Sequence, residues 1–221
     1  MDLAQDPFPA AWLIGGFLVY GAALARALVG LDLTGLGNAP LRQHLLGAAS
    51  LSLMLLWQIR SDVTPGFDIH LLGMTAFTLM LGWRLAILGA TLALIGSAVS
   101  GAEHWSVLGL QGAVLVLIPV AVSYCIWRLL ERHMPANLFI YILGCGFFGA
   151  CIATALARLV CAMLLLLSGA VDWLTMSEQY LPVFLITLFP ESFVNGAFVA
   201  ACAAYRPEWL ATFDAERYLG R

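Results

Sequence analysis

The chain has 221 residues, of which 62% are hydrophobic and only 10% are charged, whereas about a quarter of the residues of a soluble domain are charged. This composition excludes a soluble globular protein and predicts a polytopic membrane protein with one integral membrane domain, residues 1–221. The formal net charge is −3 and no run of basic residues occurs, which argues against nucleic acid as a partner.

Apolar windows separated by turn-forming residues predict an all-α bundle of about seven transmembrane helices. In chain order, the predicted helices cover residues 9–29, 43–59, 69–83, 85–102, 106–130, 137–168 and 180–205. The sixth segment is long for one perpendicular span, so it is tilted, extends beyond the bilayer, or is followed by a re-entrant piece at residues 160–171. Small residues at every fourth position, from Gly89 to Gly101 and from Gly149 to Cys161, predict close helix contacts within the chain or with another subunit.

The arginines predict the orientation of this bundle, because positively charged residues favour cytoplasmic loops. With this helix count and the N-terminus outside, Arg60 falls in an outer loop and Arg158 lies within the membrane. All the other arginines fall on the cytoplasmic side, namely Arg26, Arg42, Arg84, Arg128, Arg132, Arg206, Arg217 and Arg221. We therefore expect an outer N-terminus and a cytoplasmic C-terminus.

The same topology predicts an outer face that carries carboxylates and two histidines. These residues are Asp2, Asp6, Asp62, Asp68, His70, Glu103, His104, Asp172 and Glu178. Neutral imidazole binds Zn, Ni, Co and Cu, and a neighbouring carboxylate acts as a ligand or orients one. Residues two apart on a helix point in opposite directions, so joint ligation by Asp68 and His70 requires Asp68 to lie in a loop. The alternatives are that His70 bonds a backbone group at a helix start and that His104 is a solvated loop histidine.

Ionisable side chains within the predicted spans are costly and therefore mark candidate functional positions. Glu191 and Asn195 lie one turn apart on the last predicted helix, after Pro190, which should break or kink that helix. This polar pair either lines a pocket or joins Arg158 in a buried ion pair. An intramembrane enzyme that uses Glu191 and His70 as acid and base would need substantial helix tilt, because Glu191 lies deeper in the membrane.

Motifs of soluble catalysis are absent from the sequence. It contains no phosphate-cradling glycine loop followed by lysine, no HExxH, and no GxSxG beside a suitable base. The sequence therefore argues against an ATP-hydrolysing activity in this chain.

The third to fifth predicted helices, residues 69–124, resemble the CbiM/NikM family, the substrate-capturing membrane component of cobalt and nickel energy-coupling-factor transporters. The resemblance rests on the His-Leu-Leu-Gly entry to a span (70–73), the Leu-Gly exit (81–82), the small-residue helix that follows, and the Pro-Val-Ala-Val-Ser-Tyr close (119–124). It implies that His70 is a metal ligand. The family typically begins Met-His-Ile, whereas Asp2 occupies the second position here.

This departure implies that a four-nitrogen square-planar site cannot assemble in the family's usual way. Two alternatives follow. One is a different divalent site built from His70 with Asp68, Asp2, Asp6 or His104, and the other is a membrane scaffold or assembly protein that keeps the fold without capturing metal.

As a permease, the chain would bind cobalt or nickel as a substrate and hold no permanent cofactor. The resemblance implies three partners in a bacterial inner (plasma) membrane, where the chain would be a multi-pass protein: a transmembrane coupling subunit, cytoplasmic ATPase subunits and the lipid bilayer.

Overall fold

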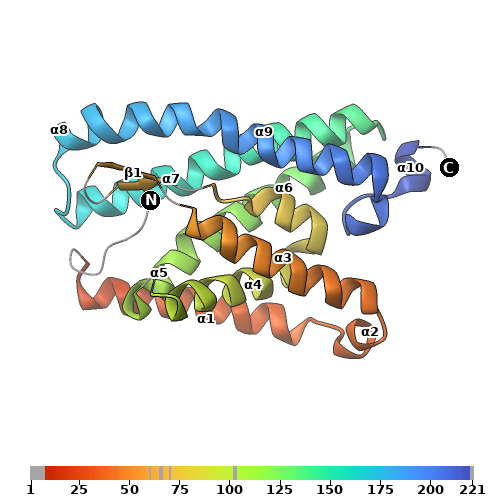
Figure 1. Cartoon of the computed structure of the whole chain (residues 1–221), viewed down its shortest axis with the longest axis horizontal. Helices are drawn as coiled ribbons and strands as arrows, with labels where there is room; N and C mark the ends of the chain where they lie inside the picture. The colour runs from red at the N-terminus through yellow and green to blue at the C-terminus, as the bar shows by residue number, and fades with distance from the viewer. Residues whose placement is uncertain (1–7, 60, 65–66, 70, 102–103, 220–221) are drawn as a thin grey trace.

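The computed structural model describes residues 8–59, 61–64, 67–69, 71–101 and 104–219. In this part of the chain, the long helices run along one axis, and Figure 1 places the start of α1 (Ala10–Val29) at one end of the bundle and α10 (Ala215–Leu219) at the other. The other helices are α2 (Leu33–Gly37), α3 (Pro40–Gln58), α4 (Met74–Val99), η1 (Trp105–Val107), α5 (Leu108–Gln111), η2 (Gly112–Leu117), α6 (Ile118–His133), η3 (Ile140–Phe148), α7 (Gly149–Leu167), α8 (Trp173–Thr175), η4 (Met176–Tyr180), α9 (Leu181–Tyr205) and η5 (Pro207–Trp209).

By length and composition alone, five helical stretches of the described residues could cross a membrane, which supports the predicted all-α polytopic fold. They are Ala10–Val29, Met74–Val99, Trp105–His133, Ile140–Leu167 and Trp173–Tyr205. Helix α3 has 19 residues but carries Arg42, Gln43 and His44 near its start, which lowers its hydropathy. The count of seven spans and the orientation in the membrane stay predictions.

Helix α4 folds back on itself at Gly82. This residue has φ 75° and ψ 161°, a conformation that is essentially restricted to glycine because it has no Cβ. A Cβ built on Gly89 would lie 2.7 Å from the Phe77 ring. In a straight helix, twelve residues would separate these two positions by about 18 Å. Residues 74–81, which we call the inner arm, therefore pack against residues 83–99, the outer arm.

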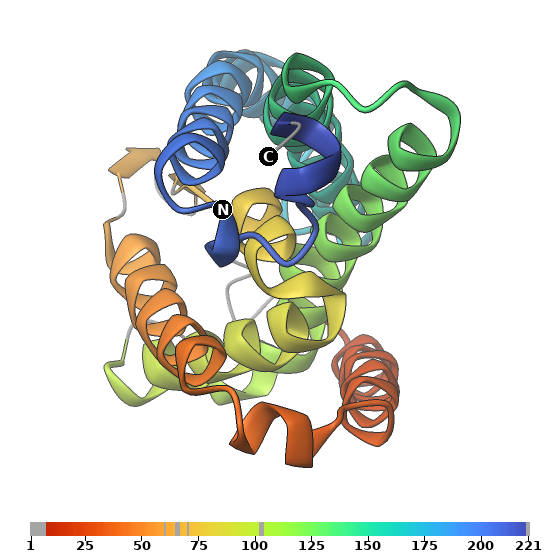
Figure 2. The same cartoon turned by 90° about the vertical axis from the view of Figure 1, so that its right-hand side faces the viewer.

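The inner arm lies at the centre of the bundle. Every residue from Met74 to Leu81 is buried, as expected for a helix that is apolar on all sides. Figure 2, which views the bundle from one end, shows the start of α4 in yellow with α3, α6 and α9 around it. At about 1.5 Å per residue the arm is about 12 Å long, which is too short to cross a hydrocarbon core of about 30 Å.

Most residues of the two small-residue ridges are buried within the chain, whereas Gly101, the last residue of the first ridge, is exposed. Gly89, Ala93 and Ser97 of the outer arm are buried. In α7, the residues of the second ridge, Gly149, Ala153, Ala157 and Cys161, are buried as well. Of the two interpretations that the sequence left open, the structure supports close contact within the chain at these positions.

One local prediction was wrong, and the structure narrows two that the sequence left open. The helix predicted from residue 69 begins at Met74, because β1 (Ser61–Thr64) and β2 (Phe67–Ile69) form an antiparallel hairpin before it. Helix α7 continues to Leu167, so of the three alternatives for the long sixth segment the structure favours a tilted or extended helix over a re-entrant piece at residues 160–171. Helix α9 continues through Pro190, so of the break or kink predicted there the break does not occur.

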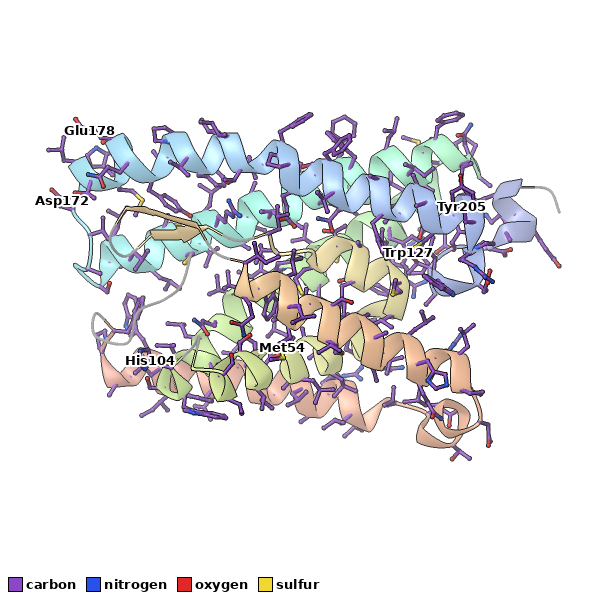
Figure 3. All side chains as sticks on the ribbon, in the orientation of Figure 1. Met54, His104, Trp127, Asp172, Glu178 and Tyr205 are labelled. Atoms are coloured by element: carbon purple, nitrogen blue, oxygen red, sulfur yellow. The ribbon has the colours of Figure 1, made fainter. Side chains whose placement is uncertain are left out.

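The two ends of the bundle carry different side chains. His104, Asp172 and Glu178 lie at one end, which we call the acidic end, whereas Tyr205 lies toward the other (Figure 3). At that other end, the Arg217 guanidinium lies 3.3 Å from the Glu131 carboxylate, and so joins α10 to the end of α6.

Candidate functional site

Of the predicted metal ligands, the structure describes Asp68 and His104. His70 and Asp2 are outside the described residues. Asp68 lies in β2, where its backbone pairs with Asp62 across the hairpin. Asp68 is therefore off the helix, which is the arrangement that joint ligation with His70 requires.

His104 precedes the short helix η1 and is exposed, in an extended conformation with φ −89° and ψ 133°. Its carbonyl accepts a hydrogen bond from the Val107 N–H at 3.2 Å, which starts that helix. Among the described residues, no group of three or more His, Cys, Asp or Glu side chains is arranged to hold a metal ion. The two predicted ligands that the structure describes, Asp68 and His104, therefore do not form a metal site by themselves.

The segment just after His70 is anchored by a buried carboxylate from α9. The Glu191 carboxylate accepts hydrogen bonds from the backbone N–H of Leu72 at 2.7 Å and from that of Gly73 at 2.8 Å. Gly73 has a positive φ of 66°, and it precedes the first residue of the inner arm. Glu191 therefore supplies an acceptor to N–H groups that have no partner within the helix, and its negative charge lies at the positive end of the helix dipole.

Asn195 completes the same hydrogen-bond network one turn along α9. Its amide N–H₂ donates to the Glu191 carboxylate at 2.8 Å and to the Glu191 carbonyl at 2.7 Å. Its side-chain oxygen accepts from the Ala76 N–H at 2.8 Å. Glu191 and Asn195 are each only 1% exposed, so these contacts offset the cost of burying their polar groups.

A third side chain anchors the same loop from the other side. The Trp57 indole N–H of α3 donates to the Leu72 carbonyl at 3.1 Å. Both backbone groups of Leu72 are therefore bonded to side chains from distant helices, and the Leu72 side chain itself is 2% exposed. Trp57 was missed by the sequence reasoning, because an apolar helix position with an indole N–H gives no sign of its partner.

The other end of the inner arm is held by the segment after α9. The Leu79 carbonyl accepts from the Thr212 hydroxyl at 2.8 Å and from the Thr212 N–H at 3.3 Å. The Met80 carbonyl accepts from the Ala211 N–H at 3.0 Å, and the Thr212 hydroxyl also contacts the Tyr141 hydroxyl at 2.8 Å. These bonds satisfy carbonyls that the break at Gly82 leaves free.

Arg158 lies near this network, on α7. Its guanidinium donates to the Thr187 hydroxyl, and its carbonyl accepts from the Tyr180 hydroxyl at 3.0 Å. Thr187 is one turn before Glu191 on α9. The Glu191 carboxylate has three hydrogen-bond donors, and the described ion pairs do not include one between Glu191 and Arg158. The direct ion pair that was one of the two interpretations of the sequence is therefore not observed.

A largely apolar cavity of about 540 Å³ opens between α3, the inner arm and α9. Leu53, Phe77 and Phe198 are among the residues that line it, and it reaches Asn195. The other interpretation of the sequence, a polar residue that lines a pocket, therefore holds for Asn195.

Comparison with protein families gives one match. The model of a family described as the cobalt uptake substrate-specific transmembrane region matches residues 3–209. The matched range includes the His-Leu-Leu-Gly segment, the whole inner arm, Glu191 and Asn195. No curated protein and no solved structure matches the chain.

Proposed function

Because the chain belongs to the CbiM family of cobalt uptake transmembrane regions, we propose that it captures a divalent transition metal ion for an energy-coupling-factor transporter. The family match over residues 3–209 carries this proposal. The fold adds that the His-Leu-Leu-Gly segment leads directly into a short, fully buried helix. Discontinuous helices of this kind border the substrate sites of many transporters.

We propose His70 as the principal ligand, with Asp68, Asp2 and His104 as the other candidate ligands. The position of Asp68 in a strand supports its inclusion, and the exposure of His104 at the acidic end supports the second imidazole. The metal is the substrate and not a resident cofactor. Cobalt is the ion to test first, and nickel is the alternative because imidazole suits both.

The energy for uptake is proposed to come from partners, a transmembrane coupling subunit and cytoplasmic ATPase subunits in the bacterial inner membrane. The alternative, a scaffold of the same fold that binds a partner through its small-residue ridges, is weakened by the burial of Gly89, Ala93 and Ser97 within the chain. A ridge that is already packed offers no surface to a second protein.

Cobalt retention by the purified, detergent-solubilised protein tests the proposal. We expect the wild type to retain cobalt after desalting and His70→Ala to lose most of it. His133→Ala is the matched control, because His133 is exposed on the last turn of α6 and bonds only the Leu129 carbonyl among the described contacts. Equal retention by the wild type and His70→Ala would contradict the proposed site, and absence of retention from the wild type would favour the scaffold.

A further inference from the structure

The loop that follows His70 is held by a set of side chains that the proposed metal chemistry does not use. Glu191 bonds the N–H groups of Leu72 and Gly73, and Trp57 bonds the Leu72 carbonyl. These contacts join α9 and α3 to the backbone at Leu72 and Gly73. Leu72 lies 119 residues before Glu191 in the sequence. His70 precedes Leu72 by two positions.

We infer that Glu191 and Trp57, with Asn195 in support, are positioning residues for metal capture: they fix the backbone at Leu72 and thereby set the affinity of the site that contains His70. The inference rests on the proposed function. None of the three side chains is offered as a metal ligand.

Chain geometry connects the anchor to the proposed ligand. Two residues of chain span at most about 7 Å, so a displacement of Leu72 is transmitted to the residue that carries the imidazole. Metal sites are sensitive to such shifts, because a ligand must be held within about 0.5 Å of its productive position. An anchor on both backbone groups of Leu72 restrains its position along two directions.

The charge of Glu191 makes this anchor difficult to replace. Its two oxygens accept from two backbone N–H groups, and such charge-assisted bonds are about twice as strong as neutral ones. In Glu191→Gln, one oxygen becomes an N–H₂ group, which cannot accept and instead points a donor at a donor. No bulk water in a membrane interior substitutes for the lost acceptor. The loop should then take up more than one position while the inner arm keeps its other contacts.

The opposite end of the inner arm offers a matched control. Thr212 also makes hydrogen bonds to a backbone group of the arm, at the Leu79 carbonyl, but this end lies seven residues further along the chain than Leu72. Thr212→Val removes the hydroxyl and keeps the shape of the side chain. If the anchors acted only through overall stability, losses at either end of the arm would affect metal binding alike.

The experiment is a titration of purified protein in nanodiscs with CoCl₂, followed by the visible absorption of bound Co²⁺, for the wild type, His70→Ala, Glu191→Gln, Trp57→Phe and Thr212→Val. The absorption reports the geometry of the ligands around the ion, which a purely structural role would not change. We expect Glu191→Gln to raise the dissociation constant about tenfold, equivalent to about 1.4 kcal/mol, and to alter the spectrum. Trp57→Phe, which keeps an aromatic ring but loses the donor, should act in the same direction with a smaller effect.

The outcomes separate the two proposals. Wild-type protein that binds no Co²⁺, or His70→Ala that binds as tightly as the wild type, overturns the proposed function. If His70→Ala loses binding but Glu191→Gln and Trp57→Phe keep the wild-type affinity and spectrum, the function stands and the positioning role is wrong. The positioning role is also wrong if Thr212→Val weakens binding as much as Glu191→Gln does. If Glu191→Gln does not fold, the comparison of Trp57→Phe with Thr212→Val decides whether the positioning role is correct.

Discussion

Replacing Gly82 by alanine tests the fold-back of α4 directly. Gly82 has φ 75° and ψ 161°, and holding a residue with a Cβ in such a conformation costs about 1–3 kcal/mol. A Cβ built on Gly82 would meet no atom within 4 Å, so the substitution adds no clash and its whole cost comes from the backbone. We expect Gly82→Ala to lower the free energy of unfolding by that amount.

The matched control is Gly21→Ala in α1. A Cβ on Gly21 also meets no atom within 4 Å, but this residue lies inside a regular helix, where alanine is more stable than glycine by about 0.5–1 kcal/mol. The two substitutions add the same methyl group and should shift stability in opposite directions. SDS titration of protein in mixed micelles, followed by circular dichroism, measures both. A Gly82→Ala variant that unfolds at the wild-type SDS fraction, or later, would refute the glycine-dependent turn.

Two further predictions concern a helix contact and a loop. Gly16→Ala should destabilise the fold by about 1–3 kcal/mol, because its Cβ would lie 2.6 Å from the Leu110 backbone nitrogen; Gly15→Ala, which meets no atom within 4 Å, should have little effect in the same SDS titration. Hydrogen bonds from the Thr175 side chain and backbone lower the pKa of the exposed Asp172 carboxyl from its ordinary value of 3.8. Its contribution to stability is therefore complete above that ordinary value and is lost as the pH falls through the lowered pKa. Wild-type protein should lose more stability than Asp172→Asn in thermal melts taken from pH 5 to about pH 3, and equal losses would show that this cap does not titrate as described.

The positions of the long helices follow from local sequence and were largely predictable. Apolar runs of about 20 residues specify helices in a membrane, since every backbone polar group must be satisfied within the segment. The break between the third and fourth predicted helices was placed between residues 83 and 85, next to Gly82, where the structure has it. The hairpin at residues 61–69 was not predicted, because such a short pair of strands has too few alternating residues to differ from a loop.

The anchoring of the inner arm was not predictable from one sequence, although its residues were noticed. Glu191 and Asn195 were singled out because a carboxylate and an amide within a span need partners. Their partners are backbone N–H groups of Leu72 and Ala76, and a backbone N–H has no sequence signature. From the sequence, the candidate partner of Glu191 is therefore Arg158, the oppositely charged side chain at similar depth. The fold brought a helix N-terminus to Glu191 instead, which only a three-dimensional arrangement can reveal.

The hydrogen bonds of the Glu191 carboxylate also bear on the role that this side chain can have within the membrane. An intramembrane carboxylate is usually taken to mark a route for ions or protons, and a free Glu191 would have suited a general acid or base. Both Glu191 oxygens, however, accept hydrogen bonds from backbone N–H groups, and Asn195 adds a third donor. The carboxylate therefore serves as a hydrogen-bond acceptor that joins α9 to the start of the inner arm. Under the proposed function, we therefore expect the metal ligands among the side chains before Leu72 and at the acidic end, with Glu191 holding the chain that leads to them.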